Sequence, residues 1–189
     1  MHGQEETSKV PRITLQIIHI LIVLFALWLY FGNGLQVISG WFGKNWVPGN
    51  CTRRLILACF SVIYFFRLFA TLFIFLKRKM GWEEVFGVST ALLVFHIGFA
   101  FAGASSVAAI CVYDYIGIVL FVIGSYLNTV SELQRHFWKQ KPENKGKLYT
   151  IGLFGLARHI NYFGDTVWLT GFAILTYNWW AFIIPILIA

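Results

Sequence analysis

The sequence predicts an all-α protein, a multi-pass transmembrane helical bundle of about five to six spans with a cytosol-facing cofactor loop. Of its 189 residues, 58% are hydrophobic and only 12% are charged, whereas soluble domains carry about 25% charged residues. Several apolar stretches are as long as the ~18 residues that mark a membrane-spanning helix. Basic residues gather in two of the segments between these stretches, as the loops of a membrane protein do.

The expected elements follow in order along the chain. Residues 1–12 form a polar tail, and residues 13–189 form a single transmembrane domain. The apolar run of the first span, 13–31, is longer than that of a cleavable signal peptide, so we expect a retained helix. The next spans cover 55–76, 85–103 and a fourth segment from Val107 or Asp114 to about Val130. The last apolar stretch, 166–189, forms either one long helix or a hairpin of two short helices around Asn178.

Charge predicts the topology. The segments 77–79 and 131–160 are separated by two spans, so they lie on the same face of the membrane. They hold nine cations, Lys77, Arg78, Lys79, Arg135, Lys139, Lys141, Lys145, Lys147 and Arg158, against three in the loop before the second span. The positive-inside rule therefore places this face and the N-terminus in the cytoplasm. The net charge of +7 has the same origin, and we expect no nucleic-acid partner.

No metal site or disulfide is expected from the cysteines. The three cysteines, Cys51, Cys59 and Cys111, have neither the spacing of metal ligands nor a paired pattern. Two of them lie in or beside apolar segments, where a free cysteine is a small packing residue.

The block 131–165 is the part of the sequence with the most chemistry. Its first part continues the fourth helix, which Pro142 ends because proline lacks an amide donor and clashes with the preceding turn. Lys145, Lys147 and Arg158 would together hold a group with two or more negative charges, and the nearby Asn161 would read a ribose or an adenine. This is equipment for a nucleotide-type cofactor. The alternative is a basic cytosolic loop that only sets topology.

Two motifs carry a resemblance to the steroid 5-alpha-reductase-like membrane superfamily. Its reductases show a pattern like N-x-G-x-L-x-x-x-G-L-(W/F)-x-x-x-R-H-P-N-Y-x-G-(E/D). The matching residues here are Asn144, Gly146, Leu148, Gly152, Leu153, Phe154, Arg158, His159, Asn161, Tyr162, Gly164 and Asp165. An upstream stretch resembles the uncharacterised reductase-like branch through Arg67, Leu68, Arg78, Glu83 and Glu84. The superfamily also includes sterol C14 and C7 reductases and, more distantly, isoprenylcysteine and phospholipid methyltransferases.

The resemblance implies a set of cofactor-binding residues. It assigns cofactor contacts to Arg158, His159, Asn161, Tyr162 and Asp165, and further charged contacts to Glu132, Lys139 and Lys147. Cations are suited to phosphate groups, and an acid is favoured at a helix N-terminus, where Asp165 is expected. The chain departs from the pattern at Ile160, which replaces the proline. Family members also continue into a further helix and a cytosolic tail, whereas this sequence ends at Ala189.

Four other polar positions lie in or beside the spans. Arg67 lines the substrate pocket or pairs with Glu83, Glu84 or a backbone carbonyl, because a charge inside a membrane needs a partner. His19 and His96 are expected to be hydrogen-bonded packing residues. We expect Asp114 to cap the fourth span, on the face opposite the cofactor. The catalytic proton donor stays unassigned; Tyr64 is a weak candidate.

The resemblance implies a membrane-embedded reductase that transfers hydride from NADPH to an activated C=C bond of a sterol-like or isoprenoid lipid in the bilayer. One alternative is an S-adenosylmethionine-dependent lipid or isoprenylcysteine-type methyltransferase. Another is a non-catalytic lipid-binding relative. The expected location is the endoplasmic reticulum in a eukaryote or the inner membrane in a bacterium, and the sequence does not give the oligomeric state.

Overall fold

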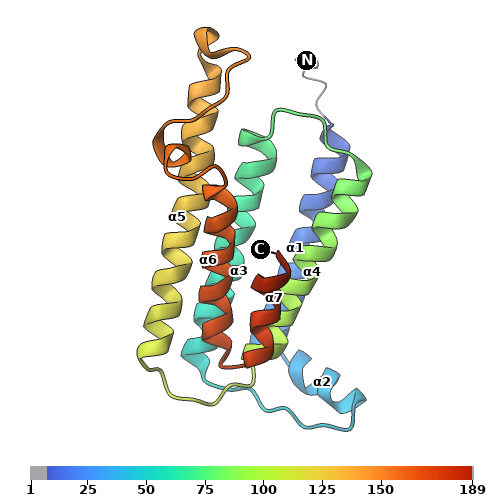
Figure 1. Cartoon of the computed structure of the whole chain (residues 1–189). Coiled ribbons are helices and arrows are strands. Elements are labelled where there is room, and N and C mark those ends of the chain that lie inside the picture. The colour runs from blue at the N-terminus through green and yellow to red at the C-terminus, as the bar shows by residue number, and fades with distance from the viewer. Residues whose placement is uncertain (1–7, 189) are drawn as a thin grey trace.

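The computed structural model describes residues 8–188, and every regular element in that range is helical (Figure 1). The all-α prediction is therefore confirmed. The α-helices are α1 (Lys9–Phe31), α2 (Gly34–Trp41), α3 (Cys51–Ala70), α4 (Trp82–Gly103), α5 (Val112–Gln140), α6 (Ile160–Thr176) and α7 (Ile183–Ile188). A π-helical turn, Thr71–Phe75, continues α3. Short 3-10 turns cover Pro142–Asn144, Gly152–Gly155 and Trp179–Phe182.

Within residues 8–188, four helices are long and apolar enough to cross a membrane. They are Lys9–Phe31, Cys51–Phe75, Trp82–Gly103 and Val112–Gln140. Of the two forms expected for the last apolar stretch, the structure has the hairpin of two helices. Tyr177 adopts a left-handed φ of 55° that ends α6, and the short helix α7 follows. The Asn178 side chain accepts a hydrogen bond from the Trp180 amide within this turn.

Several helix boundaries differ from those expected. Helix α1 begins at Lys9, inside the expected polar tail, of which residues 1–7 lie outside the described part of the chain. The fourth helix starts at Val112 and ends at Gln140, two residues before Pro142. Helix α6 starts at Ile160, so Asp165 lies more than one turn inside the helix and not at its N-terminus. The helix dipole, which acts mainly within the first turn, is therefore not what favours an acid at Asp165.

The long helices alternate in direction, which sorts their connections to two ends of the bundle (Figure 1). The connections 77–81 and 141–159 lie together with the start of α1, and we call this the basic end. The connections 32–50, 104–111 and 177–182 lie at the opposite end. The prediction that the two basic segments share one side is confirmed.

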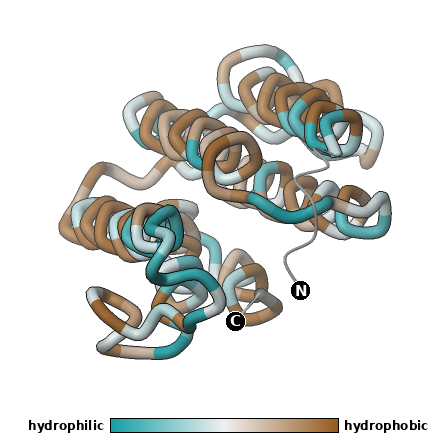
Figure 2. The backbone as a smooth tube through the Cα atoms, turned by 90° about the horizontal axis from the view of Figure 1, so that it is seen from above, coloured by the Kyte–Doolittle hydropathy of each residue, from teal (hydrophilic) through white to brown (hydrophobic). Residues whose placement is uncertain are grey.

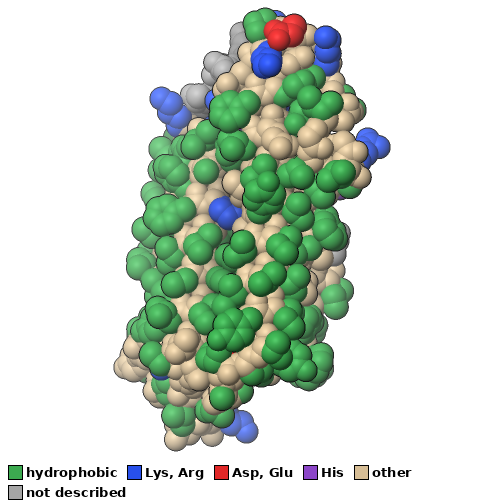
Figure 3. Space-filling model, turned by 90° about the vertical axis from the view of Figure 1, so that its left-hand side faces the viewer, with side chains coloured by type: hydrophobic (Ala, Val, Ile, Leu, Met, Phe, Trp, Pro, Cys, Tyr) green, Lys and Arg blue, Asp and Glu red, His purple; other side chains and the backbone are tan. Residues whose placement is uncertain are grey.

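An apolar belt surrounds the bundle between these ends. Figure 3 shows hydrophobic side chains covering the face on the α5 side, with charged side chains mostly at the two ends. Large side chains such as Phe66 on α3, Phe86 on α4 and Ile123 on α5 are exposed. Seen along the bundle, hydrophilic stretches gather in the connections (Figure 2). Together with four spans, this surface makes the chain an integral membrane protein.

Helices α5 and α6 pack backbone to backbone through two pairs of glycines. Gly117 and Gly124 on α5 face Gly171 and Gly164 on α6, and the two glycines of each helix are seven positions apart. A Cβ added at Gly124 would lie 2.3 Å from the Trp168 backbone nitrogen. Small residues allow such close approach in membranes, and here they bring the side chains beyond Gly124 and Gly164 into contact.

An aromatic seam joins this pair to the other helices. Phe60 on α3 stacks on Phe121 on α5, with ring centroids 3.6 Å apart, and Phe99 on α4 stacks on Phe172 on α6 at 4.4 Å. All four rings are buried. Helix α1 completes the bundle by packing on α3 and α4.

Candidate functional site

A network of polar side chains lies where α3, α5 and α6 meet, toward the basic end. Arg67 near the end of α3 donates three hydrogen bonds to side chains of α5. These reach Ser125 Oγ at 3.1 Å, Asn128 Oδ1 at 2.7 Å and Thr129 Oγ1 at 3.1 Å. Residues at positions i, i+3 and i+4 share one helix face, so α5 presents all three acceptors to one guanidinium.

Asn128 on α5 connects the network to α6. Its Nδ2 donates to Asp165 Oδ1 at 2.9 Å and to the Asn161 backbone carbonyl at 3.2 Å. The same Asp165 oxygen accepts a bond from Trp168 Nε1 at 2.9 Å and lies 3.8 Å from the Arg67 guanidinium. The close approach of α5 and α6 at Gly124 and Gly164 is what makes these bonds short.

The network continues toward the basic end through α5. Asn161 Nδ2 donates to Glu132 Oε1 at 3.0 Å, and the other Glu132 oxygen pairs with Arg135. The Arg135 guanidinium in turn lies over the Phe154 ring, 5.5 Å from its centroid. From here on, the polar network means Arg67, Ser125, Asn128, Thr129, Glu132, Arg135, Asn161 and Asp165.

Burial makes this arrangement informative. The Arg67 side chain is 12% exposed and that of Asp165 is 30% exposed, although both lie in helices of an apolar bundle. Ionisable groups at such depth are costly, pair with one another and mark functional sites in membrane proteins. The network therefore stands as the candidate site of this protein.

The alternative in which Arg67 pairs with Glu83 or Glu84 is wrong. Glu84 instead accepts two hydrogen bonds, of 2.7 and 2.6 Å, from Arg78 in the connection between α3 and α4. These bonds raise the pKa of the Arg78 guanidinium above its ordinary value. Arg67 takes its partners from α5 and α6 because it lies on the side of α3 that faces them.

Of the eight residues expected to bind a cofactor, the structure brings Glu132, Asn161 and Asp165 into the polar network. The other five, Lys139, Lys147, Arg158, His159 and Tyr162, are exposed at the basic end. The His159 and Tyr162 rings stack with centroids 5.6 Å apart. The side chains of the three cations form no hydrogen bond or ion pair within residues 8–188, which leaves them available to an anion.

The loop that carries Lys147 and Arg158 is held against α5. Gly152 adopts φ +61°, and a Cβ there would lie 2.4 Å from Gln134 Oε1. That oxygen accepts a hydrogen bond of 3.0 Å from the Leu153 amide. Only glycine fits this left-handed, crowded position comfortably, so the glycine holds the loop close to the network.

Tyr64 lies beside the network, one turn before Arg67. Its ring centroid is 4.7 Å from that of Trp168, and the Arg67 guanidinium is 5.5 Å from the Tyr64 ring. In the part of the chain that the structure describes, the Tyr64 hydroxyl makes no hydrogen bond. The buried His19 and His96 near it share a hydrogen bond between their Nε2 atoms, which lie 2.9 Å apart. Both histidines are therefore hydrogen-bonded packing residues, as expected.

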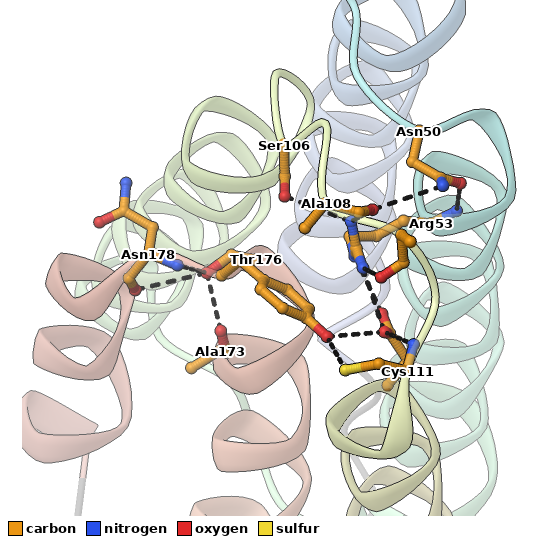
Figure 4. Close-up of polar contacts among 11 residues, drawn as sticks. Asn50, Arg53, Ser106, Ala108, Cys111, Ala173, Thr176 and Asn178 are labelled. Carbon is orange, nitrogen blue, oxygen red and sulfur yellow. Dashed lines mark hydrogen bonds and ion pairs between the residues drawn. The ribbon is translucent and has the colours of Figure 1, made fainter.

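Asp114 lies at the opposite end, as predicted, and caps α5 by accepting a 2.9 Å bond from the Cys111 amide. It also forms a bidentate pair with Arg53, at 2.9 and 3.0 Å, in which both side chains are fully buried. The Tyr177 hydroxyl donates to the same carboxylate at 2.8 Å, and the Arg53 guanidinium lies 4.0 Å from the Tyr177 ring centroid (Figure 4). This cluster ties α3, α5 and the end of α6 together and is far from the polar network.

Sequence reasoning missed Ser125, Asn128 and Thr129, and it missed Arg53 as the partner of Asp114. A signal for the first three was present, because polar residues at positions 125, 128 and 129 of an apolar span share one helix face. Arg53 had no such signal, since it was one of several cations next to a span.

The fold and the network define an integral membrane protein with a partly buried, charged site near one end of its bundle. The chain belongs to the family described as "Protein of unknown function (DUF1295)", which matches residues 78–189. That family lies within the steroid 5-alpha-reductase-like superfamily, so the resemblance found in the sequence is confirmed.

Two curated proteins of known name match parts of the chain. A stretch of 58 residues is 45% identical to "Probable O-methyltransferase ustE" of Ustilaginoidea virens, covering 31% of this chain and 20% of that protein. A stretch of 67 residues is 39% identical to "Steroid 5-alpha-reductase DET2" of Arabidopsis thaliana, covering 34% and 24%. The aligned stretches thus span a quarter or less of either relative. No solved structure matches the chain significantly.

Proposed function

We propose that this protein is a membrane-embedded reductase that transfers hydride from NADPH to an activated C=C bond of a sterol-like or isoprenoid lipid. The observation that carries the proposal is the polar network, which reaches from the basic end into an apolar bundle. The superfamily and the similarity to a steroid 5-alpha-reductase support it. When bound, NADPH would supply the hydride.

The residues at the basic end fit such a cofactor. Lys139, Lys147 and Arg158 are exposed and have no partner within residues 8–188, and cations of this kind bind phosphate groups by charge-assisted hydrogen bonds. Deeper in, Glu132 and Asn161 offer an acceptor and a donor to hydroxyl or amide groups. The donor set therefore suits a molecule with a phosphorylated end and a polar, uncharged end.

The protein itself would position the reacting groups, exclude water from the site and deliver a proton to the lipid. Arg67 and Asp165 orient each other through Asn128, which fixes the inner end of the network. The aromatic rings of Trp168 and Phe95, whose centroids lie 4.7 and 4.9 Å from that of Tyr64, would keep water out. Tyr64 is the candidate to deliver a proton to the lipid, because its hydroxyl is not engaged by the residues around it.

Methyl transfer from S-adenosylmethionine to a lipid is the second candidate. The match to a probable O-methyltransferase favours it, at a higher identity than the match to the reductase. The carboxylates of Glu132 and Asp165 also suit the ammonium group of that cofactor. The exposed cations favour NADPH, because S-adenosylmethionine has no phosphate for them to bind.

A thermal-shift titration of the full chain in detergent tests the proposal. NADPH, NADH and S-adenosylmethionine are added in parallel to the protein and to an Arg158→Ala/Asn161→Ala variant. Lys44→Ala, which removes an exposed cation at the opposite end, is the matched control. We expect NADPH to raise the melting temperature of the protein and of Lys44→Ala, and to leave the double variant unchanged.

The other results have equally clear meanings. Stabilisation by S-adenosylmethionine alone establishes the methyltransferase alternative. No stabilisation by any of the three contradicts cofactor binding and favours a non-catalytic lipid-binding protein. Equal loss in Lys44→Ala shows that the effect depends on net charge and not on the site.

A further inference from the structure

An open crevice lies at the opposite end of the bundle, between the last turns of α4 and the turn that connects α6 to α7. Its larger hollow has a volume of about 460 Å³. A second hollow of about 350 Å³ adjoins it and shares four lining residues, Ala102, Ser105, Asn178 and Trp180. Small-molecule sites typically measure about 300–1,000 Å³, so the crevice is large enough for a ligand.

Apolar side chains form part of the lining of the larger hollow. Ala102, Ala181 and Ile184 line it, and Trp46 and Phe101 form an edge-to-face aromatic pair at one side, with centroids 6.1 Å apart. Such a surface suits the hydrocarbon body of a lipid, since burial of apolar area is the main favourable term in such binding.

The rim provides uncharged polar groups. The Ser105 hydroxyl and the Asn178 Nδ2 make no hydrogen bond to any other described residue, and both line the two hollows. Trp180, which is 78% exposed, is part of the same rim. Tryptophan is enriched where a bilayer meets water, which places the rim at the depth of lipid headgroups.

Among residues 8–188, no charged residue lines either hollow. The nearest buried charges, Arg53 and Asp114, are fully buried and satisfy each other in a bidentate pair (Figure 4). An anionic headgroup would therefore meet no counter-charge in the crevice.

We propose that this crevice binds an uncharged amphipathic lipid, with its hydroxyl group at Ser105 and Asn178 and its hydrocarbon along α4 and α7. The proposal stands apart from the proposed reductase activity, because the crevice and the polar network lie at opposite ends of the bundle. It concerns binding, and the lipid held there need not be the one that reacts.

Photolabelling of the full chain in lipid nanodiscs tests the proposal. The probes are a long-chain alcohol and the fatty acid of the same length, each with an alkyl diazirine, so that they differ only in the head group, which is a hydroxyl or a carboxylate. We expect the alcohol to label peptides covering 98–106 and 176–184 several-fold more than the acid does.

Two variants and two controls sharpen the test. Ala102→Phe fills the hollow and should abolish this labelling, and Ser105→Ala should reduce it severalfold. Gly87→Phe adds the same ring to an open, exposed position of α4 and should leave it unchanged. Arg158→Ala should also leave it unchanged, which separates this site from the cofactor block. Equal labelling by acid and alcohol, or adducts spread along α5 that ignore Ala102→Phe, would overturn the proposal.

Discussion

The Asn128 side chain joins three helices through one amide. Its oxygen accepts from Arg67 on α3 and its nitrogen donates to Asp165 on α6. An amide is well suited to this position because it bridges a cation and an anion without adding charge. The two ions lie 3.8 Å apart, so Asn128 and Trp168 provide most of the close contacts of the carboxylate.

Loss of Arg67 should be costly. In Arg67→Met, the carboxylate of Asp165 and the amide of Asn128 lose a partner at a partly buried site, so we expect the free energy of unfolding to fall by about 2–4 kcal/mol. Denaturant unfolding in mixed micelles measures it. Lys139→Met, on an exposed side chain, should stay within about 0.5 kcal/mol. A similarly small change in both variants would mean that the network does not stabilise the fold.

Substitution of Asp114 should lower stability without changing cofactor affinity. Asp114→Asn leaves the fully buried Arg53 without its counter-charge, and breaking a buried pair typically costs about 3–5 kcal/mol. Because Asp114 lies at the opposite end, cofactor affinity should be unchanged in protein that is still folded. A variant of normal stability that has lost cofactor binding would contradict this assignment.

At this scale the sequence predicted ions but not their partners. Arg67, Asn161 and Asp165 were recognisable because a charge in a span, or a dense polar motif, is unusual. Asn128 was not recognisable, because the role of a neutral polar side chain in a span depends on which residues of the facing helices it contacts. The same reason explains why Glu84 was one of the candidate partners of Arg67: it is near in sequence, but it bonds Arg78.

At the scale of elements, the glycine contacts of α5 and α6 set the geometry of the network. Gly124 and Gly164 lie directly beside each other, and a Cβ at Gly164 would lie 2.7 Å from the Asn128 backbone nitrogen. The backbones approach so closely here that the side chains of Asn128 and Asp165 meet one turn further along. Separating the helices would lengthen these bonds first.

A single methyl group tests this arrangement. Gly124→Ala should lower the free energy of unfolding by about 1–3 kcal/mol, because the new Cβ meets the backbone of α6 and forces the helices apart. Gly87→Ala, where nothing lies within 4 Å, should be neutral or slightly stabilising, since alanine favours a helix over glycine. If the two substitutions had equal effects, close backbone packing of α5 and α6 would be wrong.

Helix existence followed from apolar length, but helix ends did not. The sequence placed the tail up to residue 12 and the last span from residue 166, because polar residues there looked like loop. In the structure, Arg12 is buried and donates to the Arg78 carbonyl at 2.7 Å, and Asn161 and Asp165 bond to α5. Tertiary partners thus allowed polar residues into helix ends that composition alone assigned to loops.

At the scale of the whole molecule, charge sorts the two ends of the bundle. The connections with most cations lie together at one end, and the buried Arg53–Asp114 cluster and the crevice lie at the other. Alternating spans follow from the sequence, so this arrangement was predictable. The crevice was not, because it is formed by three segments that only the fold brings together.

The orientation of the chain gives a further prediction. The positive-inside rule places the basic end in the cytosol, so Cys51, which is exposed at the opposite end, should react with an impermeant maleimide in intact bacterial cells that carry the chain in the inner membrane. The background is Cys59→Ala/Cys111→Ser. When Cys51→Ser and Lys145→Cys are added, labelling should require permeabilisation. The reverse pattern would place the cofactor block on the wrong side.

The most direct test of the central claim follows isotopes from cofactor to lipid. Membranes that contain the chain receive NADPH deuterated at the transferable hydride, or S-adenosylmethionine with a deuterated methyl group, and their lipids are analysed by mass spectrometry against Arg67→Met and Arg158→Ala/Asn161→Ala membranes. The proposed function predicts deuterium from NADPH in a lipid that has also lost a double bond, and none in the variants. A deuterated methyl group in a lipid, or no transfer from either cofactor, would contradict it.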